Sequence, residues 1–373
     1  MSHLSEIETL LPFHFAGLKA AKLLEIESYF GSLAEARSAQ EGDWQGTGLL
    51  TKIQAAKLFD SGLPALIEAA LAWQEQASEH TLLGMRDEAY PHLLKDLIDA
   101  PILLYVKGQL GLLKDPQIAL VGSRHASRLG VETAKDFAHY LSSVGLTITS
   151  GLASGIDAAA HQGGLLGQGS TVAVVGTGLD RVYPASNRQL ARQIAEQGVL
   201  VSEYPLGAGP LAHHFPQRNR IISGLSTGVL VVEAALQSGS LITARLAMEQ
   251  GREVFAVPGA INNPHAKGCH QLIKQGAKLV ESGQDVLEEL AALVQLSITE
   301  NEPSAAAKFS EKTRVNPKSN LAVLNWIEYD PIGLDELVVL SKMPVSEIQS
   351  QLMQLEVLGE VEALSAGRWR RLS

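Results

Sequence analysis

Six short apolar runs, rich in valine and isoleucine, recur between residues 117 and 257, and each leads into glycine or small polar residues. Segments of helical pattern separate the runs. Strands that alternate with helices form a mostly parallel, doubly wound sheet, because each parallel connection must cross over the sheet. The expected strands are Gln117–Val121, Leu146–Thr149, Thr171–Val175, Val199–Val201, Gly228–Val232 and Glu253–Val257. We therefore predict an α/β, Rossmann-like fold for residues 111–295.

Changes in composition divide the rest of the chain. Residues 1–80 contain two turn-then-helix units, which predict a small helical domain of the SAM or helix-hairpin-helix kind, or an acidic helical cap without a ligand. Residues 81–110 are expected to be a connecting segment. The polar stretch 296–318 predicts a linker. Residues 319–373 contain helical patterns followed by a small hairpin, which together predict a winged helix.

Charge is spread unevenly along the chain, whose net charge is −10. Residues 1–100 carry 7 basic and 15 acidic side chains, a net charge of −8, whereas residues 115–225 carry 8 and 7, a net charge of +1. Nucleic-acid binding depends on the local field and on individual phosphate contacts, so an acidic total does not exclude it. It does predict modest non-specific binding to duplex DNA.

The chain is expected to be cytoplasmic and without a membrane partner. No run of about 18 apolar residues predicts a transmembrane helix, and the first residues lack the basic and apolar regions of a secretion signal. Cys269 is the only cysteine, so neither an internal disulfide nor a cysteine-based zinc cluster is predicted.

Small, polar or arginine-bearing loops follow five successive strands, whose carboxyl ends meet at one edge of a parallel sheet. After the first strand, Gly122 permits a tight turn, and Ser123 and Ser127 can cap the next helix. Arg124 can bind a phosphate beside the free N–H groups of that helix. The other candidates are Ser150, Gly151, Leu152, Gly155, Gly176, Gly178, Tyr183, Asn187, Arg188, Arg218, Asn219, Arg220, Ser238, Gly239 and Ser240. One such loop is ordinary turn chemistry, and the fourth loop's arginines can equally form internal ion pairs, but five coincident loops predict an anion site.

Several catalytic and cofactor sites are disfavoured. No P-loop motif is present, which argues against ATP hydrolysis, and Arg181 occupies the third glycine position of a dinucleotide fingerprint, which argues against NAD. We therefore expect no cofactor. Asp157 and His161 lie four residues apart and can form an acid/base pair, two metal ligands or a packed helix N-terminus. No further ligand falls at motif spacing, so the packed helix N-terminus is preferred and no metal is expected.

The ordered series of loops resembles that of the DNA-processing DprA (Smf) family across about residues 115–280. The motifs that carry the resemblance are Val121–Arg124, Ser150–Asp157 with His161, Gly176–Asp180 with Tyr183, Pro184 and Asn187, Phe215–Gly224, and Ser238–Ala244. The resemblance implies an extended Rossmann fold that binds single-stranded DNA without catalysis. It further implies protection of incoming strands and loading of the RecA recombinase during natural transformation.

The resemblance also implies particular contacts. Carried over residue by residue, it makes Arg124 the leading phosphate ligand, beside Ser123, Gly151, Gly178 and the Tyr183–Arg188 loop. Some family members carry lysine after the Tyr-Pro pair, where this chain has Ala185, so Arg188 is the nearest cation there.

A homodimer through Gly268–Val280 is implied by the same resemblance. Its candidate anchors are Leu272, Ile273 and Leu279, which can instead pack a terminal helix onto the sheet.

Two other functions stay open at this point. A nucleotide-processing hydrolase of the lysine-decarboxylase-like Rossmann type is suggested by Glu233 before a glycine-bearing helix start, although the Gly-Gly-Gly-x-Gly-Thr loop of that type is missing. A transcription factor could act through the winged helix, whose hairpin carries Arg368, Arg370 and Arg371. Residues 301–373 hold 8 basic and 10 acidic side chains, a net charge of −2, which favours protein contact over DNA contact.

Overall fold

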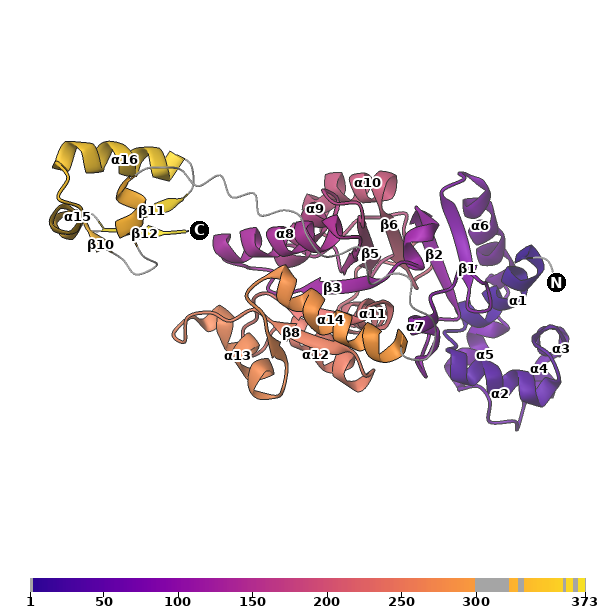
Figure 1. Ribbon diagram of the computed structural model, residues 1–373. Helices are drawn as coiled ribbons and strands as arrows, with labels where there is room; N and C mark the ends of the chain where they lie inside the picture. The colour runs from indigo at the N-terminus through magenta and orange to yellow at the C-terminus, as the bar shows by residue number, and fades with distance from the viewer. Residues whose placement is uncertain (1–2, 299–321, 328–331, 358–359, 365–367, 373) are drawn as a thin grey trace. The chain divides into compact units, whose positions relative to one another are not determined.

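The chain divides into two compact units, Met1–Asn301 and Glu302–Ser373 (Figure 1). The computed structural model describes residues 3–298, 322–327, 332–357, 360–364 and 368–372. Each unit has its own hydrophobic core. None of the helices within the described ranges combines the length and the apolar character needed to cross a membrane.

A nine-stranded sheet forms the centre of the first unit, in the order β1-β2-β6-β5-β4-β3-β7-β8-β9. The strands are β1 His80–Gly84, β2 Leu103–Gly108, β3 Gln117–Val121, β4 Thr147–Ser150, β5 Thr171–Val175, β6 Val199–Ser202, β7 Gly228–Val231, β8 Glu253–Ala256 and β9 Lys278–Leu279. The strands from β3 to β9 pair in parallel, and β1 and β2 are antiparallel. The predicted α/β, doubly wound fold is confirmed, with each of the six predicted strands shifted by no more than one residue at either end.

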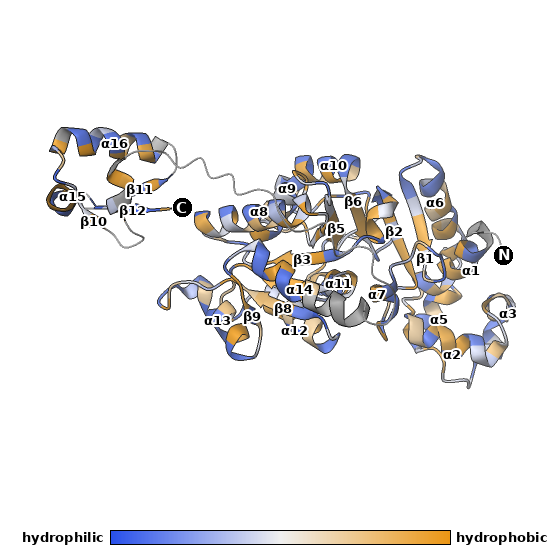
Figure 2. Cartoon of the chain, viewed as in Figure 1, coloured by the Kyte–Doolittle hydropathy of each residue, from blue (hydrophilic) through white to orange (hydrophobic). Residues whose placement is uncertain are grey.

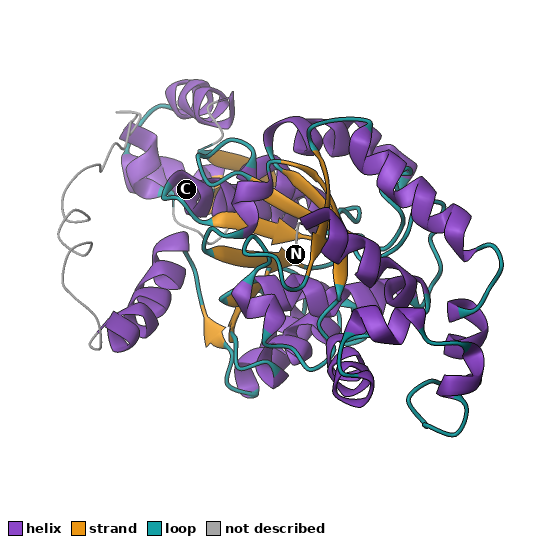
Figure 3. Cartoon of the chain, turned by 90° about the vertical axis from the view of Figure 1, so that its right-hand side faces the viewer, coloured by secondary structure: helices purple, strands orange, loops and turns teal. Residues whose placement is uncertain are grey.

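Helices cover both faces of the sheet, as Figure 3 shows. One face carries α8 Arg128–Ser143, α9 Ile156–Gly164, α10 Arg188–Gln197 and α14 Gly283–Ile298, and the other carries α11 His214–Leu225, α12 Ser240–Glu249 and α13 Lys267–Lys274. Ile118 and Leu120 of β3 pack with the first group, whereas Ala119 and Val121 pack with the second. Side chains alternate across a strand, so burial of both faces explains the continuous apolar run in the sequence, drawn orange in Figure 2.

The N-terminal helices share their core with the sheet. They are α1 His3–Phe15, α2 Ala20–Phe30, α3 Leu33–Ser38, α4 Glu41–Trp44, α5 Lys52–Leu58 and α6 Leu63–Glu75. Phe13, Trp73 and Tyr105 belong to one buried cluster that continues to the strands of the sheet. The structure therefore differs from the predicted boundary at residue 80, because the expected connecting segment 81–110 supplies most of β1, all of β2 and α7 His92–Lys95.

Buried charges join the N-terminal helices to the sheet. Arg220 of α11 donates to both carboxylate oxygens of Glu203, at 2.7 and 2.8 Å, and its Nε lies 2.9 Å from Asp99. Lys19, just before α2, also contacts Glu203. Burial alone would raise the pKa of Glu203, but the charges of Arg220 and Lys19 outweigh it and hold the pKa below its usual range.

The second unit is a small winged helix. It consists of a 3₁₀ turn Ala322–Trp326, α15 Leu334–Ser341, α16 Val345–Val357 and a sheet of β10 Ile332–Gly333, β11 Val361–Leu364 and β12 Arg368–Arg371. The predicted helices and hairpin are confirmed. Within the described residues, the first helical pattern of this domain appears only as the 3₁₀ turn. Most of the predicted linker 296–318 lies outside them, and residues 296–298 end α14.

Replacing Glu203 by Gln is expected to lower the free energy of unfolding of the first unit by about 3 kcal/mol, because it leaves buried Arg220 and partly exposed Lys19 without their shared counter-charge. Urea denaturation at pH 7 measures the change. Glu196→Gln, at an exposed position on α10, serves as the control. A loss below about 1 kcal/mol would show that the cluster contributes little to stability.

Candidate nucleic-acid interface

A cavity of about 480 Å³ opens where the strand order reverses, beyond the carboxyl ends of β3 and β7. Ligands of doubly wound sheets bind at this switch point. The cavity is lined by the loop Gly122–His125, by Ala153 and Asp157, by one side of α11, and by Gln237–Ser240 after β7. The structure thus brings the predicted loops after β3, β4 and β7 into one site.

Glu233, directly after β7, holds the start of α8. Ser127 caps that helix, since its Oγ accepts the N–H of Gly130 at 2.9 Å. The same hydroxyl donates to Glu233 at 2.5 Å, and the Ser127 N–H donates to the other carboxylate oxygen at 2.9 Å. The capping role predicted for Ser127 is confirmed. Its hydroxyl and the Glu233 carboxylate are both engaged within the protein.

The loops after β3 and β4 approach each other closely. Ile156 donates its N–H to the carbonyl of Ser123 at 3.2 Å. Gly155 has a φ of 76°, and a Cβ at this position would lie 2.3 Å from that carbonyl oxygen. A Cβ on Gly122 would lie 2.6 Å from the Ile156 side chain. These glycines therefore permit backbone contact, and they position Ser123 and Arg124 at the cavity.

The buried side chain of Arg218 connects the loop after β4 to strand β5. Only 3% of its side chain is exposed, and its guanidinium donates to the carbonyls of Gly151, at 2.5 Å, and Val174. Asp157 accepts the N–H groups of Gly151 and Ala153 at 3.2 and 3.3 Å. Burial lowers the pKa of Arg218 to about 10, although the nearby charge of Asp157 acts in the opposite direction. Arg218 supports the site from inside the protein, and its predicted phosphate contact stays a prediction.

His161 is fully buried and has a structural role. Its Nε2 accepts the N–H of Leu152 at 3.2 Å, and its Nδ1 lies 2.7 Å from the Thr171 hydroxyl, which donates to the Ile148 carbonyl. Nδ1 therefore carries the proton and the ring is neutral. Burial, with a smaller contribution from Arg218, lowers its pKa to about 3. The arrangement agrees with the packed helix N-terminus preferred from the sequence and leaves neither ring nitrogen for acid/base chemistry.

The loop after β5 closes over the loop after β4. Asn187 donates to the carbonyls of Leu152 and Ala153 at 2.9 and 3.2 Å. A Cβ on Gly178 would lie 2.5 Å from the Pro205 carbonyl, and one on Gly176 would lie 3.3 Å from Phe215. These contacts shape the backbone of the rim. They explain why Asn187, Gly176 and Gly178 are present even if no ligand contacts them.

Arg124, Phe215 and Tyr183 form a cation–aromatic cluster at the mouth of the site. The Arg124 guanidinium lies 5.4 Å from the centre of the Phe215 ring, and the Tyr183 ring centre lies 5.6 Å from that of Phe215. Arg124 is exposed and so is 49% of Tyr183. Phe215 was read in the sequence as part of a motif and was not predicted as a site residue. Its contacts with Arg124 and Tyr183 depend on the folding of α11 beneath two distant loops.

The remaining predicted residues fall into two groups. Asn219, Ser238, Gly239 and Ser240 line the 480 Å³ cavity, and Arg188 lines a second cavity beside α10. Ser150, Leu152 and Arg220 are buried, and the Ser150 hydroxyl donates to the Leu120 carbonyl at 2.6 Å. The alternative of an internal ion pair, which the sequence left open, describes Arg220. Phosphate contacts by this second group stay predictions. The side chains of the group are buried and give a phosphate little access.

The predicted dimer anchors differ in exposure. Leu272 of α13 is buried in the core, Ile273 is partly buried, and 51% of Leu279 in the edge strand β9 is exposed. No group of three or more metal-ligating side chains that could hold an ion is found among the described residues.

These features define a class of protein, a doubly wound Rossmann-like fold with a cavity at its switch point and an appended winged helix. The family model for DNA recombination-mediator protein A matches residues 81–291, and the DprA winged helix domain model matches residues 310–367. The chain belongs to the DprA (Smf) family of DNA-processing proteins. The first match begins near β1, in agreement with a sheet that includes the expected connecting segment.

Similar proteins come from distant bacteria. The chain is 44% identical to Protein Smf of Escherichia coli over 87% of this chain and 85% of the relative, and 52% identical to DNA processing protein DprA of Streptococcus pneumoniae over 54% and 72%. The X-ray structure of the Streptococcus pneumoniae protein matches with a TM-score of 0.65 and 41% identity, over 76% of this chain and 97% of that one. A Helicobacter pylori DNA processing protein A structure, described for its single-stranded DNA binding mode, matches with a TM-score of 0.52 and 30% identity, over 57% and 96%.

The neutral state of His161 predicts a loss of stability in acid. The unfolded chain binds a proton at a pH near 6.5, whereas folded His161 does so only near pH 3, so stability is lost as the pH falls through this window. His161→Gln should flatten the dependence of the free energy of unfolding on pH between 4 and 6. Buried His14, whose pKa is lowered to about 4 by burial, should preserve part of the slope.

Denaturant titrations at several pH values measure this dependence. His92→Gln, at an exposed position, is the matched control and should keep the wild-type slope. An unaltered slope in a folded His161→Gln protein would contradict the assignment of a buried neutral ring.

Proposed function

We propose that this chain binds single-stranded DNA at the carboxyl edge of its sheet and acts as a recombination mediator. The observation that carries the proposal is the cluster of exposed Arg124, half-buried Phe215 and exposed Tyr183 beside the switch-point cavity. Single strands are bound by cations that contact phosphates and aromatic rings on which bases stack. Membership of the DprA (Smf) family and the single-stranded DNA binding described for the Helicobacter pylori protein support this function.

The proposal extends to the cellular role implied by the sequence. The chain would act in the cytoplasm, protect incoming strands and load the RecA recombinase during natural transformation. The family description as a DNA recombination-mediator protein supports the recombination part. The acidic total charge, −10, supports a protein that discriminates against duplex DNA, since non-specific duplex binding depends mainly on cations.

We favour a binding protein over the alternative nucleotide-processing hydrolase. That alternative rests on Glu233, whose carboxylate accepts two hydrogen bonds from Ser127 and is 9% exposed. A carboxylate with these partners caps α8 and is not free to activate water. Assays of nucleoside monophosphate hydrolysis and of oligo-dT binding on the same preparation distinguish the two functions.

Self-association through the end of the Rossmann-like domain is also proposed. β9 is an edge strand, and exposed Leu279 lies on it. An edge strand with an apolar side chain is able to pair with a second copy of itself. Dimerisation would place two DNA sites in one particle and raise the avidity for long strands.

Arg124→Ala is expected to weaken binding to single strands of any sequence, because one phosphate contact is lost. The slope of log affinity against log salt concentration should fall by about 0.7. Fluorescence anisotropy with labelled oligo-dT from low to moderate salt measures both quantities, and duplex of the same length tests strand preference.

Arg128→Ala is the matched control for this experiment. Arg128 is a nearby arginine whose side chain is 93% exposed, and it pairs with Glu132 on α8. It should keep the wild-type affinity and slope. If a folded Arg124→Ala protein binds as tightly as the wild type, Arg124 is not a phosphate ligand.

Leu279→Arg is expected to give a folded monomer, because the side chain is exposed and the charge would oppose pairing of β9. Leu272→Arg should unfold the protein instead, since it buries an unpaired charge. Sedimentation of the wild type and of both variants, with circular dichroism, tests this. A monomeric wild type at micromolar concentration would overturn the dimer.

A further inference from the structure

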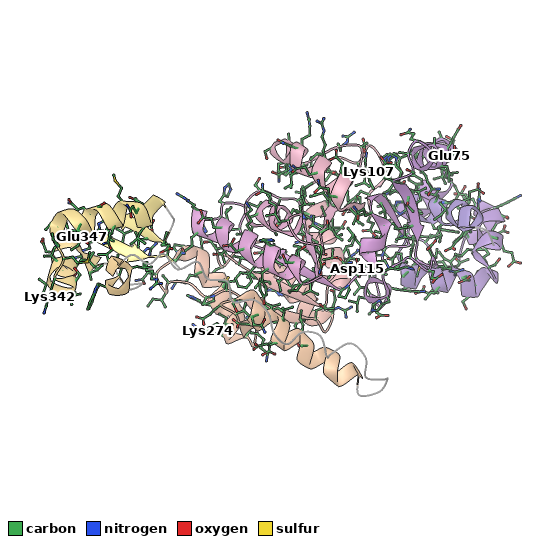
Figure 4. All side chains as sticks on the ribbon, turned by 45° about the horizontal axis from the view of Figure 1, so that its top comes forward. Glu75, Lys107, Asp115, Lys274, Lys342 and Glu347 are labelled. Atoms are coloured by element: carbon green, nitrogen blue, oxygen red, sulfur yellow. The ribbon has the colours of Figure 1, made fainter. Side chains whose placement is uncertain are left out.

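A second, basic cavity lies outside the switch-point site. Its volume is about 420 Å³, and it runs beside α10. Four cations line it, namely Lys107 of β2 (labelled in Figure 4), Arg181, Arg188 and Arg192. Asp180 is the single acidic residue among its lining. An excess of three positive charges in one cavity is notable in a chain whose net charge is −10.

The cations stand on a rigid apolar floor. Leu179, Val182, Ala191 and Leu200 line the cavity and belong to the layer packed between α10 and the strands β5 and β6. Asp180 is engaged by its neighbours, since it accepts the N–H of Gly207 at 2.9 Å and lies 3.3 Å from the Nε of Arg181. The floor offers no charge to balance Lys107, Arg188 and Arg192.

Arg188 and Arg192 follow one another on α10. Residues four apart lie on the same side of a helix, about 6 Å apart along its axis. Both arginines are exposed. Two guanidinium groups with this step can contact neighbouring phosphates of an extended strand.

One loop connects the basic cavity to the proposed DNA site. Leu179–Val182 lines the basic cavity, and the next residue is Tyr183, whose ring lies 5.6 Å from that of Phe215. Phe215 in turn lies beneath Arg124. Arg124, Phe215 and Tyr183 therefore lie in a row that begins at the switch-point cavity, and the loop that carries Tyr183 continues the row to the basic cavity beside α10.

We propose that the basic cavity formed by Lys107, Arg181, Arg188 and Arg192 is a second phosphate-binding segment for the same single strand. The strand passes Arg124 and Tyr183 and then lays its backbone along α10. The inference rests on the proposed function and adds to it a path for the strand and a longer footprint. A free nucleotide has the same phosphate chemistry, but the lining contains no neutral polar side chain that could recognise a base edge.

The test uses the full chain and two double variants. Lys107→Ala/Arg192→Ala removes two cations from the cavity, and Lys52→Ala/Lys57→Ala removes two exposed cations from α5 as the matched control. Fluorescein-labelled dT oligonucleotides of about 6 and about 30 nucleotides are the probes. The cavity variant should bind the long probe roughly tenfold more weakly, its salt slope should fall by about 1.4, and the short probe should bind as to the wild type. The control should bind both as the wild type does.

Three outcomes would overturn the inference. The first is an unchanged affinity of the cavity variant for the long probe, and the second is an equal loss for both probes. The third is loss of dTMP binding in the cavity variant while the long probe is unaffected, which would make the cavity a site for free nucleotides. Sedimentation must show the same oligomeric state for all variants, so that a change of avidity is not mistaken for a lost contact.

Arg124→Ala, measured beside them, separates this inference from the proposed function. If Arg124→Ala weakens both probes and the cavity variant weakens neither, only the second segment is wrong. If Arg124→Ala changes neither probe, the switch-point site itself is wrong, and with it the inference.

Discussion

The buried guanidinium of Arg218 connects the loops around the switch-point cavity. It binds the carbonyl of Gly151, in the loop after β4, and that of Val174 in β5, while Asp157 beside it accepts the N–H of Gly151. A buried cation without such acceptors would be costly, so the carbonyls must converge on it for the chain to fold. The loop that presents Ser123 and Arg124 contacts Gly155 and Ile156 of the loop after β4, and Asn187 donates to the carbonyls of Leu152 and Ala153 in the same loop. The rim is in this sense built around an internal charge.

Buried and exposed arginines have different roles in this part of the protein. Arg218 and Arg220 are buried, where Arg218 donates to backbone carbonyls and Arg220 pairs with Glu203. Arg124 and Arg192 are exposed. A chain with a net charge of −10 thus still carries exposed arginines near these loops and on α10.

The sequence predicts the parts of the fold that leave local patterns. The apolar runs of β3 to β8 are buried on both faces, and the sequence of the winged-helix hairpin contains Gly359 and Gly367, so both are visible in a single sequence. β1 and β2 were missed, because their short apolar runs flank a helix and turns that resemble a connection. In the site, the glycine loops were predictable from turn chemistry. The burial of Arg220 was not, because it depends on Glu203, 17 residues away, and on Lys19 of another layer. The role of Phe215 likewise arises only when α11 meets the loops after β3 and β5.

The pairing of β2 with β6 has a consequence for how the protein can be divided. A fragment that begins at residue 111, where the sequence suggests a boundary, would lose β1 and β2 and expose the backbone of β6 along its open side. It would also expose to water the apolar side chains of the core that Tyr105 and Val106 cover. Such an unprotected strand is a template for pairing between molecules and for aggregation. Strands β1 and β2 thus protect the edge of the parallel strands, and we expect the smallest autonomous form of the first unit to include them.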